Sequence, residues 1–302
     1  MTPRRLFKLS IAYPLEAIAV ALCHYGLKTI SLDRSSDVGG AVLRTLGPLY
    51  RPLQGLALSN LAKAFPEKSL TEHQEIAYWM WDNLGRIVAE YSHLDTFASM
   101  QDSSRVAVIG AEHVEAARED GLPGLFLAAH YANWEIAALS VIKRNLPLTQ
   151  IYKAANNPFV NYMVRRAQRH VTRALIPKSA TGAKHLLRAM SQQAHIMMMV
   201  DQRMDNGIAI PFFGRPAMTA SAIGRLALRY QCPLIPTQVI RFKGTSQFEV
   251  RFFKPLDLPQ HGTMEERLRA LMTDVNHCIE TWVRERPDLW LWIHSRWGKE
   301  PC

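Results

Sequence analysis

The sequence predicts an α/β fold in which a mixed, mostly parallel sheet is flanked by helices and preceded by a helical N-terminal region. Between residues 106 and 200, short apolar runs alternate with segments of helical periodicity, which is the pattern of a layered α/β domain. The first hundred residues show helical patterns only. We therefore expect an N-terminal helical region over residues 1–100 and an α/β domain over residues 101–302.

The N-terminal region begins with a stretch, residues 10–32, that is apolar enough to anchor the chain in a membrane. On a helix, four of its side chains fall along one narrow stripe and the rest of the surface is largely apolar: Glu16, Val20, His24 and Lys28. This pattern indicates a helix that lies in the interface or spans the bilayer with one protected face, and a soluble core helix is the alternative. Further helices are expected over residues 35–50 and 52–65, and from a capping-box spacing at Thr71 to about residue 93.

The α/β pattern starts after a short polar segment at residues 98–105. Periodicity predicts four strands, over residues 106–109, 124–129, 148–152 and 195–200, and four helices, over residues 112–119, 134–143, 159–171 and 182–191. Residues 233–242 and 247–253 are expected to form an antiparallel hairpin around Gly244. A last long helix is predicted from the capping box at Thr263 to a point before Pro287.

The composition favours anionic partners, because the chain carries a net charge of +10 and has a pI of about 9.6. Nucleic acid, a phospholipid surface and an acidic carrier all fit that charge. The four cysteines show no metal-ligand spacing and no obvious pairing, which indicates a reducing compartment: Cys23, Cys232, Cys278 and Cys302. Nucleotide-binding glycine motifs, the zinc-hydrolase pattern His-Glu-x-x-His and the Gly-x-Ser-x-Gly elbow are absent from the sequence.

The most informative stretch surrounds His130, where an apolar run ends and a helix is expected to follow with Asn133 as its N-cap. His130 is therefore expected just beyond the carboxyl end of a strand, where open α/β sheets bind their ligands. Glu135 falls in the first helical turn. If the chain folds back, Glu135 can hold one ring nitrogen of His130 and leave the other to deprotonate a substrate hydroxyl. A structural histidine satisfied by this carboxylate is the alternative.

The pattern His130-x-x-x-x-Glu135 resembles the His-x-x-x-x-Asp/Glu signature of glycerolipid and lipid A acyltransferases. Further motifs appear in the same order as in the bacterial lipid A late acyltransferases, the lauroyl and myristoyl transferase family. These motifs are residues 60–67, 81–86, 151–158, 201–202, 211–214 with Thr219, and 292–297. The resemblance covers nearly the whole chain.

This resemblance implies a membrane-attached O-acyltransferase at the cytoplasmic face of the bacterial inner membrane. The enzyme would move a fatty acyl chain from an acyl carrier protein thioester, with coenzyme A as the alternative donor, to a hydroxyl of a lipid A precursor. His130 would be the general base and Glu135 its partner, with no metal or other cofactor, and the chain would act as a monomer. Another phospholipid or glycolipid acceptor is the alternative within this class. A basic nucleic-acid-binding protein is the alternative from a different class.

The expected substrate-binding residues lie on two segments. Arg165, Arg166 and Arg169 share a predicted basic helix, whose charges could simply form a solvated face. The resemblance implies that an arginine of this helix contacts substrate, and we expect Arg166, with the register among the three left open. Tyr152, Lys153 and Asn157 belong to the motif that leads into this helix.

Asp201 and Gln202 follow the apolar run at residues 195–200, so they share a sheet edge with His130 if the strands are parallel. In the family that the chain resembles, this aspartate belongs to the active site. Residues 211–214 are either a loop that packs an acyl chain or ordinary core. For His294, Arg296 and Trp297 we expect a structural or interfacial role.

Overall fold

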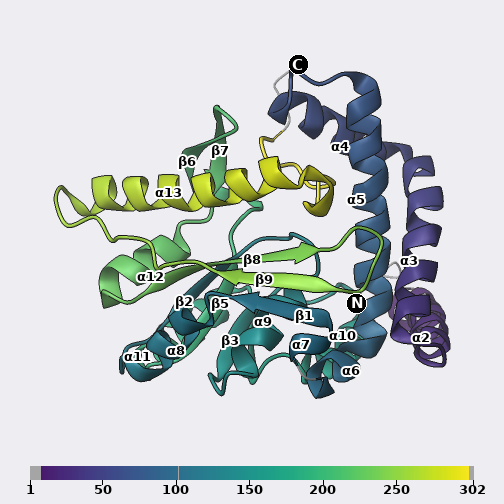
Figure 1. Ribbon diagram of the computed structural model, residues 1–302, viewed down its shortest axis with the longest axis horizontal. Helices are drawn as coiled ribbons and strands as arrows, with labels where there is room; N and C mark the ends of the chain where they lie inside the picture. The colour runs from purple at the N-terminus through teal and green to yellow at the C-terminus, as the bar shows by residue number, and fades with distance from the viewer. Residues whose placement is uncertain (1–7, 101, 299–302) are drawn as a thin grey trace.

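A seven-stranded sheet forms the centre of the protein (Figure 1), of which the computed structural model describes residues 8–100 and 102–298. Its strand order is β1-β9-β8-β2-β5-β3-β4, and β8 and β9 are the only neighbours among these strands that pair antiparallel. The strands are β1 (Val106–Ile109), β2 (Leu125–Ala128), β3 (Leu148–Tyr152), β4 (Ala174–Pro177), β5 (His195–Met199), β8 (Leu234–Arg241) and β9 (Phe248–Phe252). The prediction of a mixed, mostly parallel sheet is confirmed.

Helices cover both faces of this sheet. In Figure 1, α12 (Ala222–Tyr230) and α13 (Met264–Glu285) lie above it, and the remaining helices of the α/β part lie below it. The lower group contains α8 (Ala111–Glu119), α9 (Trp134–Ile142), α10 (Pro158–Gln168) and α11 (Ala180–Ser191). The central strands β2 and β8 are buried along their whole length, as parallel strands with both faces covered should be.

The N-terminal part is helical, as predicted, and its elements pack along one end of the sheet (Figure 1). They are η1 (Lys8–Ala12), α2 (Tyr13–Lys28), α3 (Leu32–Leu46), η2 (Gly47–Leu49), α4 (Arg51–Ala64), α5 (Leu70–Glu90), η3 (Tyr91–His93), α6 (Leu94–Ser99) and α7 (Asp102–Arg105). The capping box of α5 is formed by Ser69 and Glu72, so this helix begins before the predicted Thr71. Helices α3 and α5 approach closely at Gly39 and Gly85, where a Cβ on either residue would lie within 2.3 Å of the other's carbonyl oxygen.

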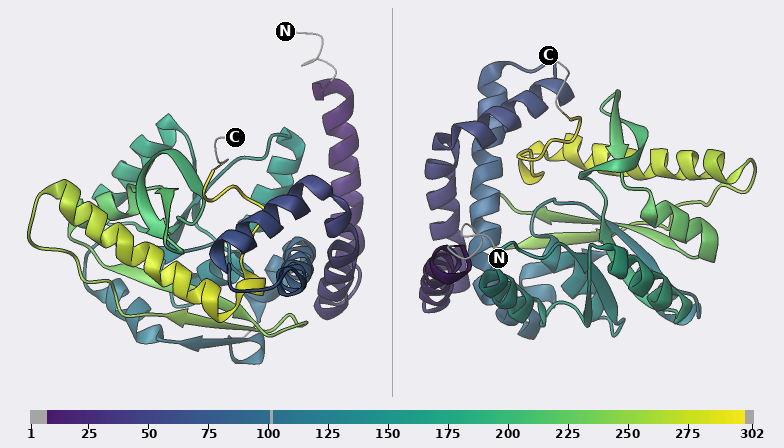
Figure 2. Two further views of the ribbon diagram at one scale, coloured as in Figure 1. Left: turned by 90° about the horizontal axis from the view of Figure 1, so that it is seen from above. Right: turned by 180° about the vertical axis from the view of Figure 1, so that it is seen from behind.

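Helix α2 lies along one side of the molecule and extends past its neighbours (Figure 2). The segment Ser10–Lys28 is, by length and composition, the one helix among the described residues that could cross a membrane, and none of it is buried. Its polar stripe faces the protein: Glu16 accepts a hydrogen bond from Asn157 Nδ2 at 3.0 Å, and Lys28 forms an ion pair with Asp95. The apolar remainder, including Leu15 and Leu22, is exposed.

The sequence prediction did not include the short helices α6 and α7, strand β4, helix α12 or a two-stranded hairpin of β6 (Arg203–Phe212) and β7 (Arg215–Thr219). Phe212 and Phe213, at the turn of this hairpin, are buried against an aromatic cluster of Trp290, Trp292 and Trp297. Phe212 and Phe213 therefore belong to the core, whereas Pro211 and Gly214 are exposed. The described cysteines Cys23, Cys232 and Cys278 are free thiols, and Cys302 lies outside the described residues.

A buried ion pair joins the N-terminal helices to the sheet. Arg241, at the end of β8, binds both oxygens of Glu90, at the end of α5, at 2.5 and 2.8 Å. The Nε of Arg241 also donates to Asn83 Oδ1 at 2.9 Å. Because Asn133 Nδ2 donates to Glu90 Oε2 at 2.8 Å, this pair reaches the turn between β2 and α9.

Candidate active site

His130 and Asp201 meet because β2 and β5 are neighbours with Ala128 opposite Met199. Each of the two residues follows its strand by two positions, so both emerge at the same edge of the sheet. Asp201 Oδ1 lies 2.8 Å from His130 Nδ1, and Asp201 Oδ2 accepts the His130 backbone N–H at 2.9 Å. These two contacts fix both the position and the rotation of the imidazole.

The loop that carries His130 is held by the C-terminal segment. Ala132 has a left-handed backbone, with a φ of 46°, and its N–H donates to Leu289 O at 2.9 Å. The carbonyl of His130 accepts the N–H of Leu291 at 3.2 Å. Asn133 caps α9, as predicted, by accepting the N–H of Glu135 at 3.2 Å.

Asp201 is a buried carboxylate that stays ionised. Burial by itself would raise its pKa, but the charge of His130, with hydrogen bonds from its ring and backbone, holds the pKa of Asp201 well below its usual range. A third donor, the indole N–H of Trp290, reaches Oδ2 at 2.8 Å. Asp201 can therefore orient the imidazole and stabilise its protonated form.

The second ring nitrogen of His130 faces Gln202. Gln202 Nε2 lies 3.3 Å from His130 Nε2, which matches an amide that donates to an unprotonated ring nitrogen. Gln202 also lines a cavity of about 370 Å³ together with Arg203, Asp205, His294 and Ser295. Gln202 thus lies in contact with both Nε2 of His130 and this polar cavity.

Glu135 does not hold His130 in this structure, so the predicted contact is corrected: the carboxylate beside the imidazole is that of Asp201. The left-handed turn at Ala132 starts α9 with the buried Glu135 side chain directed to three other donors. Glu135 accepts from Tyr91 Oη at 2.5 Å, from Gln168 Nε2 at 2.8 Å and from Gln150 Nε2 at 3.5 Å. It therefore joins η3, α10 and β3 to the start of α9.

Arg165 and Arg166 on α10 and Arg169, which directly follows this helix, have different surroundings. Arg165 lies over the ring of Tyr152, 5.8 Å from its centroid, and the neighbouring Lys153 is exposed. Arg166 lines a cavity of about 280 Å³ between α10 and α2, whereas Arg169 lines a different depression beside Asn145. Only Arg166 is therefore directed at a space that also borders the N-terminal helix.

Asn157 has no free hydrogen-bonding group for a ligand. Its Oδ1 accepts the N–H groups of Phe159 and Val160 at the start of α10, and its Nδ2 donates to Tyr13 O at 2.8 Å and to Glu16. These contacts attach α10 to α2. Asn157 was expected to contact substrate. In this structure its side chain instead caps α10 and holds α10 against α2.

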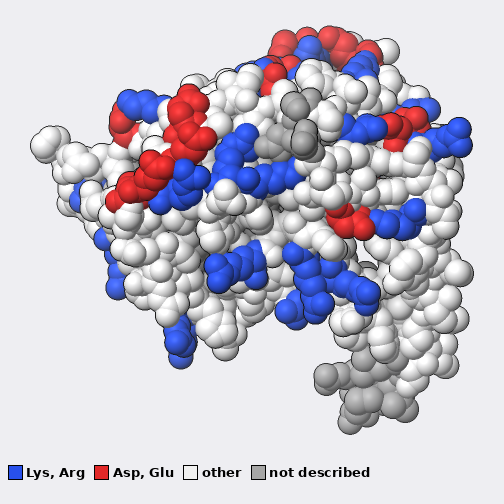
Figure 3. All heavy atoms as spheres, turned by 60° about the horizontal axis from the view of Figure 1, so that its bottom comes forward, with Lys and Arg blue, Asp and Glu red and all other residues white. Residues whose placement is uncertain are grey.

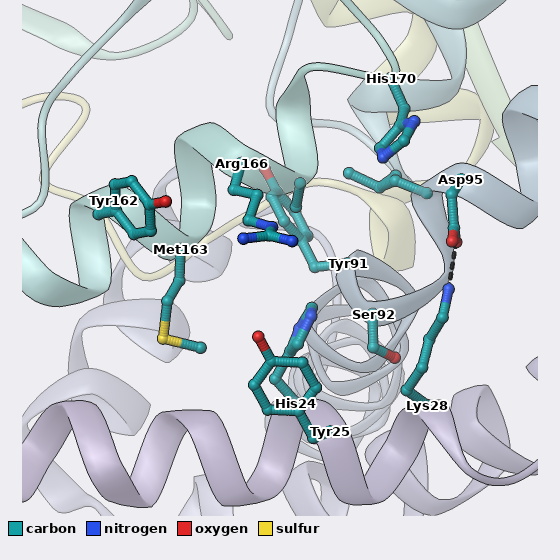
Figure 4. Close-up of a pocket in the computed structure, with 12 residues that line it drawn as sticks. His24, Tyr25, Lys28, Tyr91, Ser92, Asp95, Tyr162, Met163, Arg166 and His170 are labelled. Atoms are coloured by element: carbon teal, nitrogen blue, oxygen red, sulfur yellow. Dashed lines mark hydrogen bonds and ion pairs between the residues drawn. The ribbon is translucent and has the colours of Figure 1, made fainter.

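The cavity at Arg166 is one end of a longer cleft between α2 and α10 (Figure 4). His24, Tyr25 and Lys28 from α2 face Tyr162, Met163 and Arg166 from α10 across it. Tyr162 and Met163 also line an adjoining apolar depression of about 380 Å³, whose other walls are Pro14, Ala17, Ile18, Ala21 and Phe159. The cleft is therefore polar and cationic at one end and apolar at the other, and Tyr91 connects its polar wall to Glu135.

The sequence matches a family described as bacterial lipid A biosynthesis acyltransferases over residues 20–299. The chain belongs to this family. It is 24% identical to a lipid A biosynthesis myristoyltransferase of Escherichia coli and to lipid A biosynthesis acyltransferase 1 of Shigella flexneri, with 83% of this chain and 76% of each relative covered. It is also 21% identical to a lipid A biosynthesis palmitoleoyltransferase of Escherichia coli, covering 87% of this chain and 83% of that relative. The resemblance seen in the motifs is confirmed, and the protein is an O-acyltransferase.

The active-site region of this acyltransferase contains four side chains that the sequence did not point to: Tyr91, Gln150, Gln168 and Trp290. Each reaches a carboxylate from an element distant in the chain, and a glutamine or tyrosine inside a helix or strand gives no pattern of its own. Trp290 had a weak signal, since it begins the tryptophan-rich end of the chain. The arrangement supplies a held base, an ionised partner and an amide at a cavity wall, which suits deprotonation of a hydroxyl.

Proposed function

We propose that this protein transfers a fatty acyl chain from an acyl carrier protein thioester to a hydroxyl of a lipid A precursor, at the cytoplasmic face of the inner membrane. The observation that carries the proposal is the imidazole of His130, which is held at Nδ1 by the ionised Asp201 and contacts at Nε2 the Gln202 amide that lines a polar cavity. Membership of the lipid A acyltransferase family supports this choice of acceptor and favours an enzyme over a nucleic-acid-binding protein.

His130 performs the proton transfers of the proposed reaction. Its Nε2 takes the proton of the acceptor hydroxyl while the hydroxyl oxygen attacks the carbonyl carbon of the thioester. The carbonyl electrons move to the oxygen, and the tetrahedral intermediate collapses to expel the thiolate. The thiolate takes the proton from the imidazolium, so the products are an ester and a free thiol. Asp201 stabilises the imidazolium between the two transfers.

Glu135 acts in this proposal as a positioning residue. Its carboxylate brings three donors, from η3, α10 and β3, to the first turn of α9. Burial and the adjacent Glu135 charge raise the pKa of Tyr91 well above its ordinary value, so the phenol keeps its proton and donates. Removal of the carboxylate would leave these donors without an acceptor in the interior.

The cleft between α2 and α10 fits the acceptor lipid. A phosphate of the lipid would bind Arg166 at the polar end, because guanidinium groups bind phosphate through charge-assisted hydrogen bonds. The acyl chains would follow the apolar walls towards the exposed side of α2, which we propose is embedded in the membrane. Tyr152 and Lys153, at the carboxyl end of β3, would contact the sugar portion between this cleft and His130.

The proposal that an acyl carrier protein is the acyl donor rests on the distribution of charge. The chain carries a net charge of +10, and the face below the sheet shows separate Lys and Arg clusters with few acidic groups between them (Figure 3). An acidic carrier protein is attracted to such a face over long range, whereas free coenzyme A gains less from a broad distribution of charge.

The test is a transfer assay with the full-length protein in mixed micelles. Acyl carrier protein and coenzyme A thioesters are each offered with a lipid A precursor, a lysophospholipid and a diacylglycerol glycolipid, and the products are weighed by mass spectrometry. We expect the lipid A precursor to gain one acyl group from the carrier protein thioester, with the His130→Ala variant as the inactive control. Transfer only to the lysophospholipid, or equal transfer by His130→Ala, would contradict the proposal.

A further inference from the structure

His294 is a second histidine beside the His130–Asp201 pair. Its ring packs edge-on against Trp290, with the ring centroids 4.9 Å apart, and Trp290 in turn donates to Asp201. Asp201 and His130 are close enough to influence the charge of His294.

Both ring nitrogens of His294 are buried, and neither has a hydrogen bond of ordinary geometry, although the backbone of Asp201 lies close enough to interact weakly with the ring. Buried polar groups are nearly always paired, because an unpaired donor or acceptor in the interior is destabilising. Burial lowers the pKa of His294 to about 4, so the ring is neutral near pH 7 and carries one N–H donor. A phenylalanine would fill the same space beside Trp290 without this penalty, which indicates that a partner arrives from outside the protein.

The position of His294 shows where that partner would bind. His294 and Gln202 line the same cavity, and Gln202 is the side chain that covers Nε2 of His130. In the ligand-free chain the Gln202 amide occupies the place that the acceptor hydroxyl must take beside Nε2. A bound acceptor would therefore displace Gln202 and open the cavity towards His294.

We infer that His294 is a further catalytic residue, which donates its N–H, together with the displaced Gln202 amide, to the oxygen of the thioester carbonyl. This inference rests on the proposed acyl transfer. When the hydroxyl attacks the carbonyl carbon, the negative charge that develops on this oxygen lies between two neutral donors. A neutral imidazole suits this role, since it donates a hydrogen bond without transferring its proton to the intermediate.

The test separates turnover from packing with two substitutions at His294. His294→Phe keeps a planar ring against Trp290 and removes the donor, and His294→Gln keeps a donor. For His294→Phe we expect kcat to fall about 10²- to 10³-fold, the usual effect of removing one oxyanion donor, with KM for both substrates nearly unchanged. We expect its melting temperature to stay equal to that of the parent or rise, and His294→Gln to recover part of kcat.

The matched control is His195→Phe, at the amino end of the same β5 strand that leads to Asp201. The His195 ring is paired, with Nε2 2.9 Å from Ala117 O, so this variant should melt earlier and keep its kcat. Full kcat in His294→Phe, or a lower melting temperature with kcat restored at lower temperature, would overturn the inference. A parent protein that transfers no acyl group at all would instead refute the proposed function on which the inference depends.

Discussion

Two buried carboxylates, Asp201 and Glu135, lie near the same edge of the sheet and have different surroundings. Asp201 accepts two hydrogen bonds from His130 and one from Trp290, so its charge faces a titratable ring. Glu135 accepts three hydrogen bonds from neutral donors on three separate elements. The first carboxylate is placed to act on the chemistry of His130, and the second to hold the elements around it. The difference shows that the spacing His130-x-x-x-x-Glu135 does not by itself say which carboxylate contacts the imidazole.

The largest effect is expected on the Asp201 side. Asp201→Asn removes the charge that favours the imidazolium and orients the ring, so kcat should fall about 10²- to 10³-fold with KM little changed. His130→Ala should lower kcat by about 10²- to 10⁴-fold. Because the two residues act as a unit, the double variant should be little slower than His130→Ala, as measured by steady-state kinetics on folded protein. If the loss of kcat in the double variant equals the product of the losses in the two single variants, Asp201 acts independently of His130.

A smaller loss of turnover is expected on the Glu135 side. Glu135→Gln keeps the size of the side chain but offers Tyr91, Gln168 and Gln150 a single acceptor oxygen, so melting temperature should drop by several degrees and kcat by about tenfold. The double variant with His130→Ala should melt below His130→Ala by the same number of degrees as Glu135→Gln melts below the parent. If Glu135→Gln is as slow as His130→Ala and melts like the parent, Glu135 contacts the reacting groups in the bound state and the comparison fails.

The smallest effect is expected at Arg166, whose cavity borders Tyr91 on the Glu135 side. Arg166→Gln should raise KM for the acceptor about tenfold, because one charge-assisted hydrogen bond to the acceptor is lost. The values of kcat and melting temperature should stay nearly unchanged. Arg169→Gln removes the same charge from the same helix outside this cleft and serves as the control. Equal KM shifts in both variants would point to general attraction by the basic face in place of a site at Arg166.

The sequence places His130 and Asp201 at one edge if their strands are parallel, because periodicity identifies the strands and parallel strands end together. It could not show that β2 and β5 are neighbours, since strand order depends on packing between segments about seventy residues apart. The direction of Glu135 depends on the left-handed turn at Ala132, a residue type that gives no signal for such a backbone.

The missed elements have similar causes. The β6–β7 hairpin contains Pro211 and Pro216, which lower the expectation of a strand, and its pairing is interrupted between Arg203 and Ile208. Strand β4 has only four residues and lies at the sheet edge. For His294 the sequence predicts a structural or interfacial role, because the motif at residues 292–297 gives no indication of what its rings face.

The Glu90–Arg241 pair has a consequence for making a soluble form of this enzyme. Removing the apolar α2 would delete a helix that contributes no buried residue, and α3 has its own N-cap at Ser31. A cut at residue 100 would instead remove Glu90 together with the rest of α5, so the Arg241 guanidinium would lose its buried carboxylate partner and its cover. It would also release Asn133, and with it the turn that presents His130. We therefore expect the shortest version that folds to begin near Ser31, and this version would lack the α2 wall of the cleft.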